Sequence, residues 1–462
     1  MNGRRWLQWA MTSTRVLVGI GAAVGIALVA AFAVAADWPS RPHRPATVTA
    51  TPAAADTVLS CPGGLLALGR DATNAAGLST AAPQTLTSSG DGTRTPLRTI
   101  PEVPGADVLS VTARAGTSGA GALAASGSTA VAADDLRGFA ASGCRAPAME
   151  SWLVGGAGTT GASDLILLAN PGEVPAVADL TVFGASGALR PPGGQDLVIP
   201  PGVQRVVPLA GLAVGEEAPV VLVTATGAPV TATLQAALTR TLAPGGVDQV
   251  TPVTPDTAAV VPGVTVAPSA AAETEATTVV RLLSPGRDDS ATVSVVGAGG
   301  DQVLTHQVPL TADVPTQLEL AGLPAGSHTV SVTSSAPVVS AVWQATGLGA
   351  GSDFAWYAPA PRLDADALVV VPEGAGSAVA VASAATGPVE VRLDPAGPGG
   401  ATGSTATVAP GHAVTLPAPA GAYWLRVDGP VHAEVVFAAD GALAAFPVIP
   451  VAADASAVTV HP

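Results

Sequence analysis

The chain has 462 residues, of which 48% are hydrophobic and only 11% are charged, and its formal net charge is −15. This length predicts several domains, and the hydrophobic content excludes disorder along the whole chain. Every basic residue is Arg, which excludes a phosphate-binding loop of the Walker type and a kinase site, because both need Lys. The acidic excess also predicts that nucleic acid is not a partner.

The N-terminus carries the first predicted element, an apolar helix. Residues 1–15 contain three Arg, residues 16–36 are uncharged, and all 34 acidic residues follow them. As a helix, residues 16–36 span about 32 Å, enough for a bilayer core of about 30 Å. The positive-inside rule then predicts residues 1–15 as a cytoplasmic N-terminus, residues 16–36 as a transmembrane anchor, and the rest of the chain outside the cell membrane.

The alternative is a signal peptide cleaved near Ala35, because Ala33-Val34-Ala35 has the small-x-small pattern of a cleavage site. The apolar run is longer than a signal peptide normally has, which favours a retained anchor. Either prediction exports most of the chain. Residues 37–55 are rich in Pro and polar residues, and they predict an extended tether.

The chain's two cysteines, Cys61 and Cys144, both fall in residues 56–150. Two thiols in an oxidising compartment normally pair, so we expect a disulfide rather than two buried free thiols. A zinc site is excluded because two Cys without a nearby His cannot supply four ligands. Residues 56–150 are therefore predicted as a disulfide-bonded N-terminal β region that caps the rest, with one helical turn near residues 134–141.

A repeated phrase divides the remaining chain. Pro-Val or a close variant recurs at Pro229, Pro337 and Pro430, each time between two strand-like runs, which predicts a hairpin. Upstream, short alternating runs recur in the same order in each copy, as is typical of a small antiparallel sandwich. We therefore predict an all-β fold of tandem immunoglobulin-like β-sandwich repeats, arranged as a rod. A β-propeller with two blades per copy is the alternative.

The predicted boundaries place repeat 1 at 151–240, a linker and repeat 2 at 241–350, and repeat 3 at 351–462. The Thr, Pro and Ala content of residues 241–275 predicts that this connection is a spacer.

Several short motifs carry a family resemblance: Cys61-Pro62, Cys144 followed closely by Trp152-x-Val154-Gly155-Gly156, Asn170-Pro171 and the repeated Pro-Val phrase. With the N-terminal anchor, the chain resembles an uncharacterised family of actinobacterial membrane-anchored exported proteins. The resemblance implies a cell-envelope setting, alongside membrane glycosyltransferases. It supplies no catalytic residue, because none is assigned in the family.

The sequence patterns predict no catalytic residue, no metal site and no cofactor. The acidic pairs Asp288-Asp289 and Asp364-x-Asp366 are interpreted as solvated turn residues rather than Ca²⁺ ligands. Two aromatic groups are the candidate binding surface, because exposed rings can stack on sugars, although rings at a joint between domains also pack one domain on the next. These residues are Phe354, Trp356, Tyr357, Tyr423 and Trp424.

Together these features predict a non-catalytic scaffold or binding protein of the cell envelope. Its expected partners are the lipid bilayer, through residues 16–36, and either an envelope glycan or a membrane protein such as a membrane glycosyltransferase system. The alternative is a glycan-acting hydrolase whose carboxylates come from distant strands.

Overall fold

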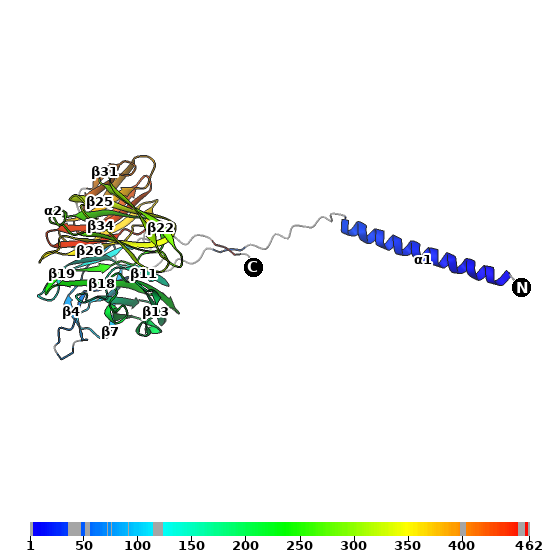
Figure 1. The fold of residues 1–462 in the computed structure, drawn as a ribbon, viewed down its shortest axis with the longest axis horizontal. Helices are drawn as coiled ribbons and strands as arrows, with labels where there is room; N and C mark the ends of the chain where they lie inside the picture. Colours follow the sequence, from blue (N-terminus) through cyan, green and yellow to red (C-terminus); the bar gives the residue numbers. More distant parts are fainter. Residues whose placement is uncertain are drawn as a thin grey trace. The chain divides into compact units, whose positions relative to one another are not determined.

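The structure is a computed structural model that describes residues 3–35, 48–50, 56–71, 73–74, 76–90, 92–113, 123–397, 403–450 and 458–460. The chain divides into two compact units, residues 1–53 with 455–462 and residues 54–454, and each is described here by itself. The first contains a long helix and the second is built from strands (Figure 1). The predicted all-β class is confirmed.

The first unit contains helix α1 (Gly3–Ala35). Its segment Thr14–Ala35 has a mean hydropathy of 2.5 and is long and apolar enough to cross a membrane. A signal sequence near an N-terminus has the same properties. Strand β1 (Val48–Ala50) pairs antiparallel with β36 (Val458–Val460). The last residue of the predicted anchor and most of the predicted tether, residues 36–47 and 51–55, lie outside the described residues.

The second unit contains three repeats with one strand order. The strands of the first repeat are β11 (Glu150–Val154), β12 (Leu165–Asn170), β13 (Ala176–Gly184), β14 (Gly187–Leu189), β15 (Leu197–Ile199), β16 (Val203–Pro208), β17 (Val220–Thr226), β18 (Thr231–Arg240) and β19 (Ala243–Val250). Two 3₁₀ turns accompany them, η1 (Pro192–Gly194) and η2 (Leu209–Gly211).

In the described ranges the second repeat contains seven strands, and the third contains nine, like the first. The second has β20 (Asp256–Val266), helix α2 (Pro268–Ala271), β21 (Thr278–Leu283), β22 (Asp289–Gly297), β23 (Gln302–Leu310), β24 (Thr316–Glu319), β25 (Gly326–Ala345) and β26 (Phe354–Tyr357). The third has β27 (Arg362–Leu363), β28 (Ala367–Val371), β29 (Ser377–Ser383), β30 (Val389–Pro395), β31 (Ser404–Val408), β32 (Ala413–Pro417), β33 (Gly421–Val427), β34 (Val431–Ala439) and β35 (Ala442–Pro447).

Each repeat places its strands in two sheets. The first sheets have the orders β11-β17-β13-β14, β20-β25-β22-β23 and β28-β33-β30-β31. The second sheets have the orders β16-β12-β18-β19, β24-β21-β25-β26 and β32-β29-β34-β35. Buried Val, Leu, Ile and Ala from both sheets form one core in each repeat, which makes each a two-layer sandwich. The immunoglobulin-like assignment stays a prediction.

The recurring prolines mark the point where the chain changes sheet. Pro229, Pro337 and Pro430 occupy equivalent positions, directly before the strand segments that lie in the second sheets. The predicted hairpin across each proline is wrong, because the preceding strand lies in the first sheet of its repeat. The actual hairpin partner is the following strand: β19, β26 or β35. A proline fits such a corner because its missing N–H removes no bond from either ladder.

The N-terminal region follows a shortened form of the same plan. Its strands form the sheets β2-β8-β6 and β5-β9-β10 and the hairpin β3-β4, while β7 pairs parallel with β16 of the first repeat. They are β2 (Thr57–Cys61), β3 (Leu65–Leu68), β4 (Leu78–Ala82), β5 (Thr85–Ser88), β6 (Thr93–Pro96), β7 (Arg98–Ile100), β8 (Leu109–Ala113), β9 (Ala125–Ala132) and β10 (Arg137–Gly143). The helical turn expected near residues 134–141 is wrong, because β10 begins there.

The last strands of the N-terminal region and of the three repeats together form a closed ring within the second unit. β10 contacts β19, β19 contacts β26, β26 contacts β35, and β35 contacts β10. These inner strands are buried on both faces, which explains why they pack against each other rather than against solvent. The predicted rod is therefore wrong, since a linear array would not bring the N-terminal region against the third repeat.

The predicted spacer over residues 241–275 is also wrong. Strands β19 and β20 and helix α2 occupy most of it, and its Val side chains, such as Val247, Val261 and Val264, are fully buried. The apolar residues within this stretch favour burial, and this outweighs the loop-like Thr and Pro content.

Candidate functional site

A cavity of about 210 Å³ lies between the first and second repeats. Strand β18 and nearby loops of the first repeat form one side, and β21, β25 and β26 of the second repeat form the other. We call it the junction cavity. Its charged, amide and aromatic lining residues are Asp164, Glu217, Arg281, Gln317, Trp343, Phe354 and Trp356.

Arg281, on β21, ties the two repeats together at this cavity. Its Nη1 donates to the carbonyl oxygens of Gly156 and Pro219, both at 2.9 Å. Its Nη2 donates to the carbonyl oxygen of Glu217 at 3.4 Å and to Gln317 Oε1 at 3.3 Å. The side chain is buried, and burial lowers its pKa to about 9. The guanidinium therefore places a positive charge at the wall while bonding to three carbonyls of the first repeat.

Three aromatic rings form the wall that the second repeat contributes. Trp343 and Trp356 lie directly opposite each other across β25 and β26, and the Trp343 and Phe354 rings are 6.1 Å apart. The Arg281 guanidinium lies 4.7 Å from the Trp356 ring centre, and that of Arg240 lies 5.7 Å from the Trp343 ring centre. Both contacts are in the range of cation–π attraction. Trp356 and Phe354 are buried and Trp343 is half-buried, so Trp343 is the ring most open to a ligand.

Asp164 is the buried carboxylate of the junction cavity. Its Oδ2 accepts from the backbone N–H of Ala157 at 2.6 Å, and its Oδ1 accepts from that of Ala237 at 2.9 Å. Burial raises its pKa to about 6, although both hydrogen bonds and the Arg281 charge oppose the shift. Gly156 lies so close that an added Cβ would collide with Asp164 Oδ2. Asp164 thus holds the cavity loops through its two backbone hydrogen bonds.

A second buried aspartate lies where the four inner strands meet. Asp353 precedes β26, and its carboxylate accepts from the backbone N–H of Phe139 at 2.8 Å, Val247 at 3.1 Å and Leu443 at 3.1 Å. These donors belong to β10, β19 and β35 respectively. One side chain therefore connects the N-terminal region with all three repeats. Burial raises the pKa of Asp353 to about 7 against the effect of these bonds.

Two glycines make room for this carboxylate. Gly138 has φ +144° and Gly246 has φ +123°, a region that favours glycine. An added Cβ at either position would meet Asp353 Oδ1 in less than van der Waals distance. The inner strands can therefore approach the aspartate only without side chains at these two positions.

Further ionisable groups are buried along the inner strands. Asp248 Oδ2 accepts from the backbone N–H of Trp356 at 2.7 Å. Within the described part of the chain, neither carboxylate oxygen of Glu434 has a hydrogen-bond partner. Burial raises the pKa of both acids and lowers the pKa of Arg145, whose charge favours ionised Glu434, to about 10. Asp248 and Glu434 are fully buried, so these two carboxylates offer no surface to a ligand.

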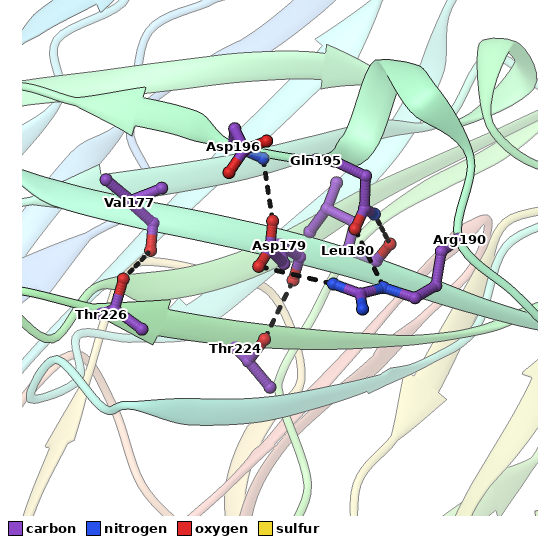
Figure 2. Close-up of polar contacts among 8 residues, drawn as sticks. All are labelled: Val177, Asp179, Leu180, Arg190, Gln195, Asp196, Thr224 and Thr226. Atoms are coloured by element: carbon purple, nitrogen blue, oxygen red, sulfur yellow. Dashed lines mark hydrogen bonds and ion pairs between the residues drawn. The ribbon is translucent and has the colours of Figure 1, made fainter.

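An exposed polar cluster on the first sheet of the first repeat holds a loop (Figure 2). Arg190 reaches Asp179 at 3.6 Å and donates to Gln195 Oε1 at 2.9 Å, and Gln195 donates in turn to the Leu180 carbonyl. Asp179 Oδ1 also accepts from the backbone N–H of Asp196 at 2.8 Å. The side chains of Asp179, Arg190 and Gln195 therefore bond to neighbouring backbone or side-chain groups, and these bonds stabilise the loop at residues 190–196.

The structure confirms one prediction about the site residues and contradicts most of another. The Cys61–Cys144 disulfide is confirmed. The predicted exposed aromatic surface is wrong for four residues, which are at most 7% exposed because they fill space between sheets and repeats: Phe354, Trp356, Tyr357 and Tyr423. Trp424 is half-buried beneath the Arg426 guanidinium, 4.8 Å away. Two of the five, Phe354 and Trp356, nevertheless line the junction cavity.

The acidic residues interpreted as turn residues bond to nearby backbone and Arg side chains. Asp288 and Asp289 accept backbone N–H groups, and Asp364 and Asp366 pair with Arg side chains. Across the described ranges, no group of three His, Cys, Asp or Glu side chains could hold a metal ion.

Sequence reasoning missed Asp164, Arg281, Trp343 and Asp353. Trp343 follows the repeated Pro-Val phrase, and the other two copies have no aromatic residue at the equivalent strand position. This difference between the copies could have identified Trp343 from the sequence. The other three are single charged residues beside apolar strands, and no local pattern distinguishes them from surface charges.

Comparison with known proteins identifies a family but no function. Residues 100–419 match a family described as "Family of unknown function (DUF5719)". No curated protein and no solved structure matches the chain. The match runs from β7 to β32 and includes every residue that lines the junction cavity.

Proposed function

The chain belongs to DUF5719, a family of unknown function, and we propose that it is a membrane-tethered, non-catalytic binding protein of the cell envelope that contacts envelope glycan. The apolar helix Thr14–Ala35 supports a tether with a cytoplasmic N-terminus. The Cys61–Cys144 disulfide supports an oxidising compartment for the second unit. The resemblance to actinobacterial exported proteins supports an actinobacterial envelope and a membrane glycosyltransferase system as a further partner.

The composition of the junction cavity carries the glycan proposal. Trp343 offers a half-buried ring for the apolar face of a sugar. The Glu217 carboxylate and the Gln317 amide offer groups for its hydroxyls, and Nε of Arg281 is the guanidinium nitrogen without a hydrogen-bond partner among the described residues. A volume of about 210 Å³ is below the ~300 Å³ at which pockets for larger ligands begin. The site therefore suits one ring or the end of a chain, not a long polysaccharide.

Calorimetric titration of the full-length protein in detergent with soluble peptidoglycan and cell-wall polysaccharide fragments tests this proposal. Trp343→Ala should weaken binding roughly tenfold, because it removes the ring most open to the ligand. Trp424→Ala is the matched control, since Trp424 is also a half-buried ring beneath an Arg but lies in the third repeat. Unchanged binding by Trp343→Ala, or equal losses in both variants, would contradict the assignment.

The topology is tested separately by adding protease to intact protoplasts. A retained anchor should leave a short N-terminal fragment in the membrane while the second unit is digested. Recovery of the second unit from the medium, with an N-terminus near residue 36, would contradict the tether and support a cleaved signal peptide.

A glycan-acting hydrolase is the second candidate, and one observation favours it. Asp164 and Glu217, from different parts of the first repeat, line the same cavity. The pKa of Asp164, raised to about 6, suits a general acid. Mass spectrometry of peptidoglycan and polysaccharide digests should show defined fragments if this is correct. Their loss in Glu217→Gln, at an exposed residue, would overturn the non-catalytic proposal.

A further inference from the structure

A second cavity, of about 270 Å³, lies between the N-terminal region and the third repeat. We call it the Cys144 cavity. It is lined by β2, the start of β9, the end of β10, β28, β34 and the segment from β35 to Pro450. Thr57 has the only polar side chain among the lining residues, which otherwise are Leu, Val, Ile, Ala, Gly, Pro, Phe and the disulfide-bonded Cys144.

The cavity has a buried floor and an open mouth. Val369, Val370 and Phe446 are at most 4% exposed, whereas Ile449 is 40% exposed and Pro450 is also exposed. Protein interiors are normally packed without such voids, and an unfilled apolar cavity lowers stability. Apolar cavities exclude water and accept apolar ligands. The lining side chains therefore favour a hydrocarbon group, and the Thr57 hydroxyl is the one polar side-chain group among the described residues that line the cavity.

Two lining residues, Thr57 and Pro450, lie at the beginning and the end of the described part of the second unit. Strand β2 begins at Thr57, and the described residues of this unit end at Pro450. Residues 36–56 join Thr57 to the end of α1 at Ala35, and a link of this length can span at most roughly 75 Å. In a tethered protein this covalent limit bounds the distance between the cavity and the membrane, which makes membrane lipid the nearest source of hydrocarbon chains.

We propose that the Cys144 cavity binds a linear hydrocarbon chain, the acyl chain of a membrane lipid. The proposal rests on the proposed membrane tether for the source of the lipid and is independent of the junction cavity. The chain would enter past Ile449 and lie against Leu368 and Val370, with its polar head outside. No covalent step is involved, since burial of methylene groups supplies the binding free energy.

Photocrosslinking tests the proposal on the full-length protein in phosphatidylglycerol vesicles that contain a diazirine-labelled acyl chain. Adducts on peptides around residues 57–59, 123–125 and 446–450 are expected in addition to adducts on α1. Excess unlabelled decanoic acid should remove the first group and leave the second. Adducts confined to α1 would overturn the proposal.

Two variants and a control variant test whether the adducts arise from binding in the Cys144 cavity. Ala124→Phe places a ring in the cavity, and Ile449→Glu places a carboxylate at its exposed mouth. Each should reduce the cavity adducts roughly tenfold, the effect of displacing about two methylene groups from an apolar site. Ala384→Phe, at a similarly half-buried alanine outside the cavity, should leave them unchanged. Equal adducts in Ile449→Glu and wild type would overturn the proposal even if Ala124→Phe fails to fold.

A second arm separates the cavity from the tether. Diazirine-labelled decanoic acid is added to detergent-free protein, whether it is recovered from membranes or from the medium. Labelling of the same three peptides without vesicle association supports the cavity and contradicts only the tether. Vesicle association without labelling of these peptides in either arm contradicts the cavity and leaves the tether supported.

Discussion

The N-terminal region and the third repeat both contribute an inner hairpin to the ring, but they are stabilised in different ways. The third repeat has one core built from both of its sheets, with Phe437 fully buried in it. The buried residues of the N-terminal region divide among three small clusters, two of which contain residues of the first repeat. Two further residues, Phe139 and Ala141, belong to the core of the third repeat.

This difference shows how a shortened copy can keep its fold. Its sheets are too small to bury a core of their own, so it relies on neighbouring repeats and on the Cys61–Cys144 cross-link. The two regions meet directly, since the Phe139 and Phe437 rings are 5.2 Å apart. Perturbations should therefore separate covalent stabilisation, core packing and the shared buried aspartate.

Removing the cross-link is expected to have the largest effect. The disulfide joins residues 83 apart, and the loop-entropy account of such a link gives about 4 to 5 kcal/mol. Replacing Cys61 and Cys144 together with Ser should lower the free energy of unfolding by about this amount. Hydrogen exchange should show protection lost first in β2 and β8. Equal loss of protection in the third repeat would contradict the proposed division between the regions.

Truncating the core of the third repeat should cost slightly less. Phe437→Ala removes a fully buried ring that packs on Phe139, and such a change typically lowers the free energy of unfolding by about 3 to 4 kcal/mol. Urea titration followed by circular dichroism measures it. Val214→Ala, at a side chain that is 81% exposed, should stay within about 0.5 kcal/mol of wild type.

Asp353→Ala should affect both regions at once. It leaves the N–H groups of Phe139, Val247 and Leu443 without their acceptor, which should cost about 3 kcal/mol in total. Hydrogen exchange should rise together in β10 and β35. Asp179→Ala is the control, because this partly exposed aspartate serves only a loop, and its loss should cost under about 1 kcal/mol. Faster exchange in only one of the two strands would contradict the role of Asp353 in stabilising both regions.

The smallest effect expected is the change in the free energy of unfolding for each pH unit. Burial raises the pKa of folded Asp353 from its ordinary 3.8 to about 7, so the folded state binds more protons than the unfolded state between these values. Its contribution is fully present below about pH 4 and is lost as the pH rises to about 7. The stability difference between wild type and Asp353→Asn should therefore fall by up to about 1.4 kcal/mol per pH unit in this window. A difference that does not vary with pH would mean that Asp353 is ionised throughout.

Most strands could be predicted from the sequence, because alternating apolar residues report burial of one face. The alternating runs at 179–183, 291–295 and 389–393 lie in strands β13, β22 and β30, in which buried and more exposed residues alternate. The inner strands could not be recognised in this way, since both their faces are buried and their residues do not alternate. Residues 243–250 therefore look like a loop until their neighbours are known.

The candidate site was predictable only in part. Phe354 and Trp356 were identified as a group of aromatic residues, yet their burial and the contribution of Trp343 depend on the pairing of β25 with β26. Arg281 bonds to carbonyls more than 60 residues away, and Asp353 bonds to strands 90 to 214 residues away. Contacts across such separations leave no trace in local sequence patterns.

The sequence by itself determined the all-β class, the apolar N-terminal helix, the repeat positions of the prolines and the cysteine pairing, since each follows from local composition, periodicity or compartment chemistry. Only the tertiary structure decided that the chain changes sheet at each proline, that the inner strands close a ring, and that the junction cavity and the Cys144 cavity form where distant segments meet. The physical reason is that a strand's partner depends on which distant apolar faces and backbone groups remain to be satisfied. Which faces and backbone groups remain depends on the whole second unit and not on any one segment.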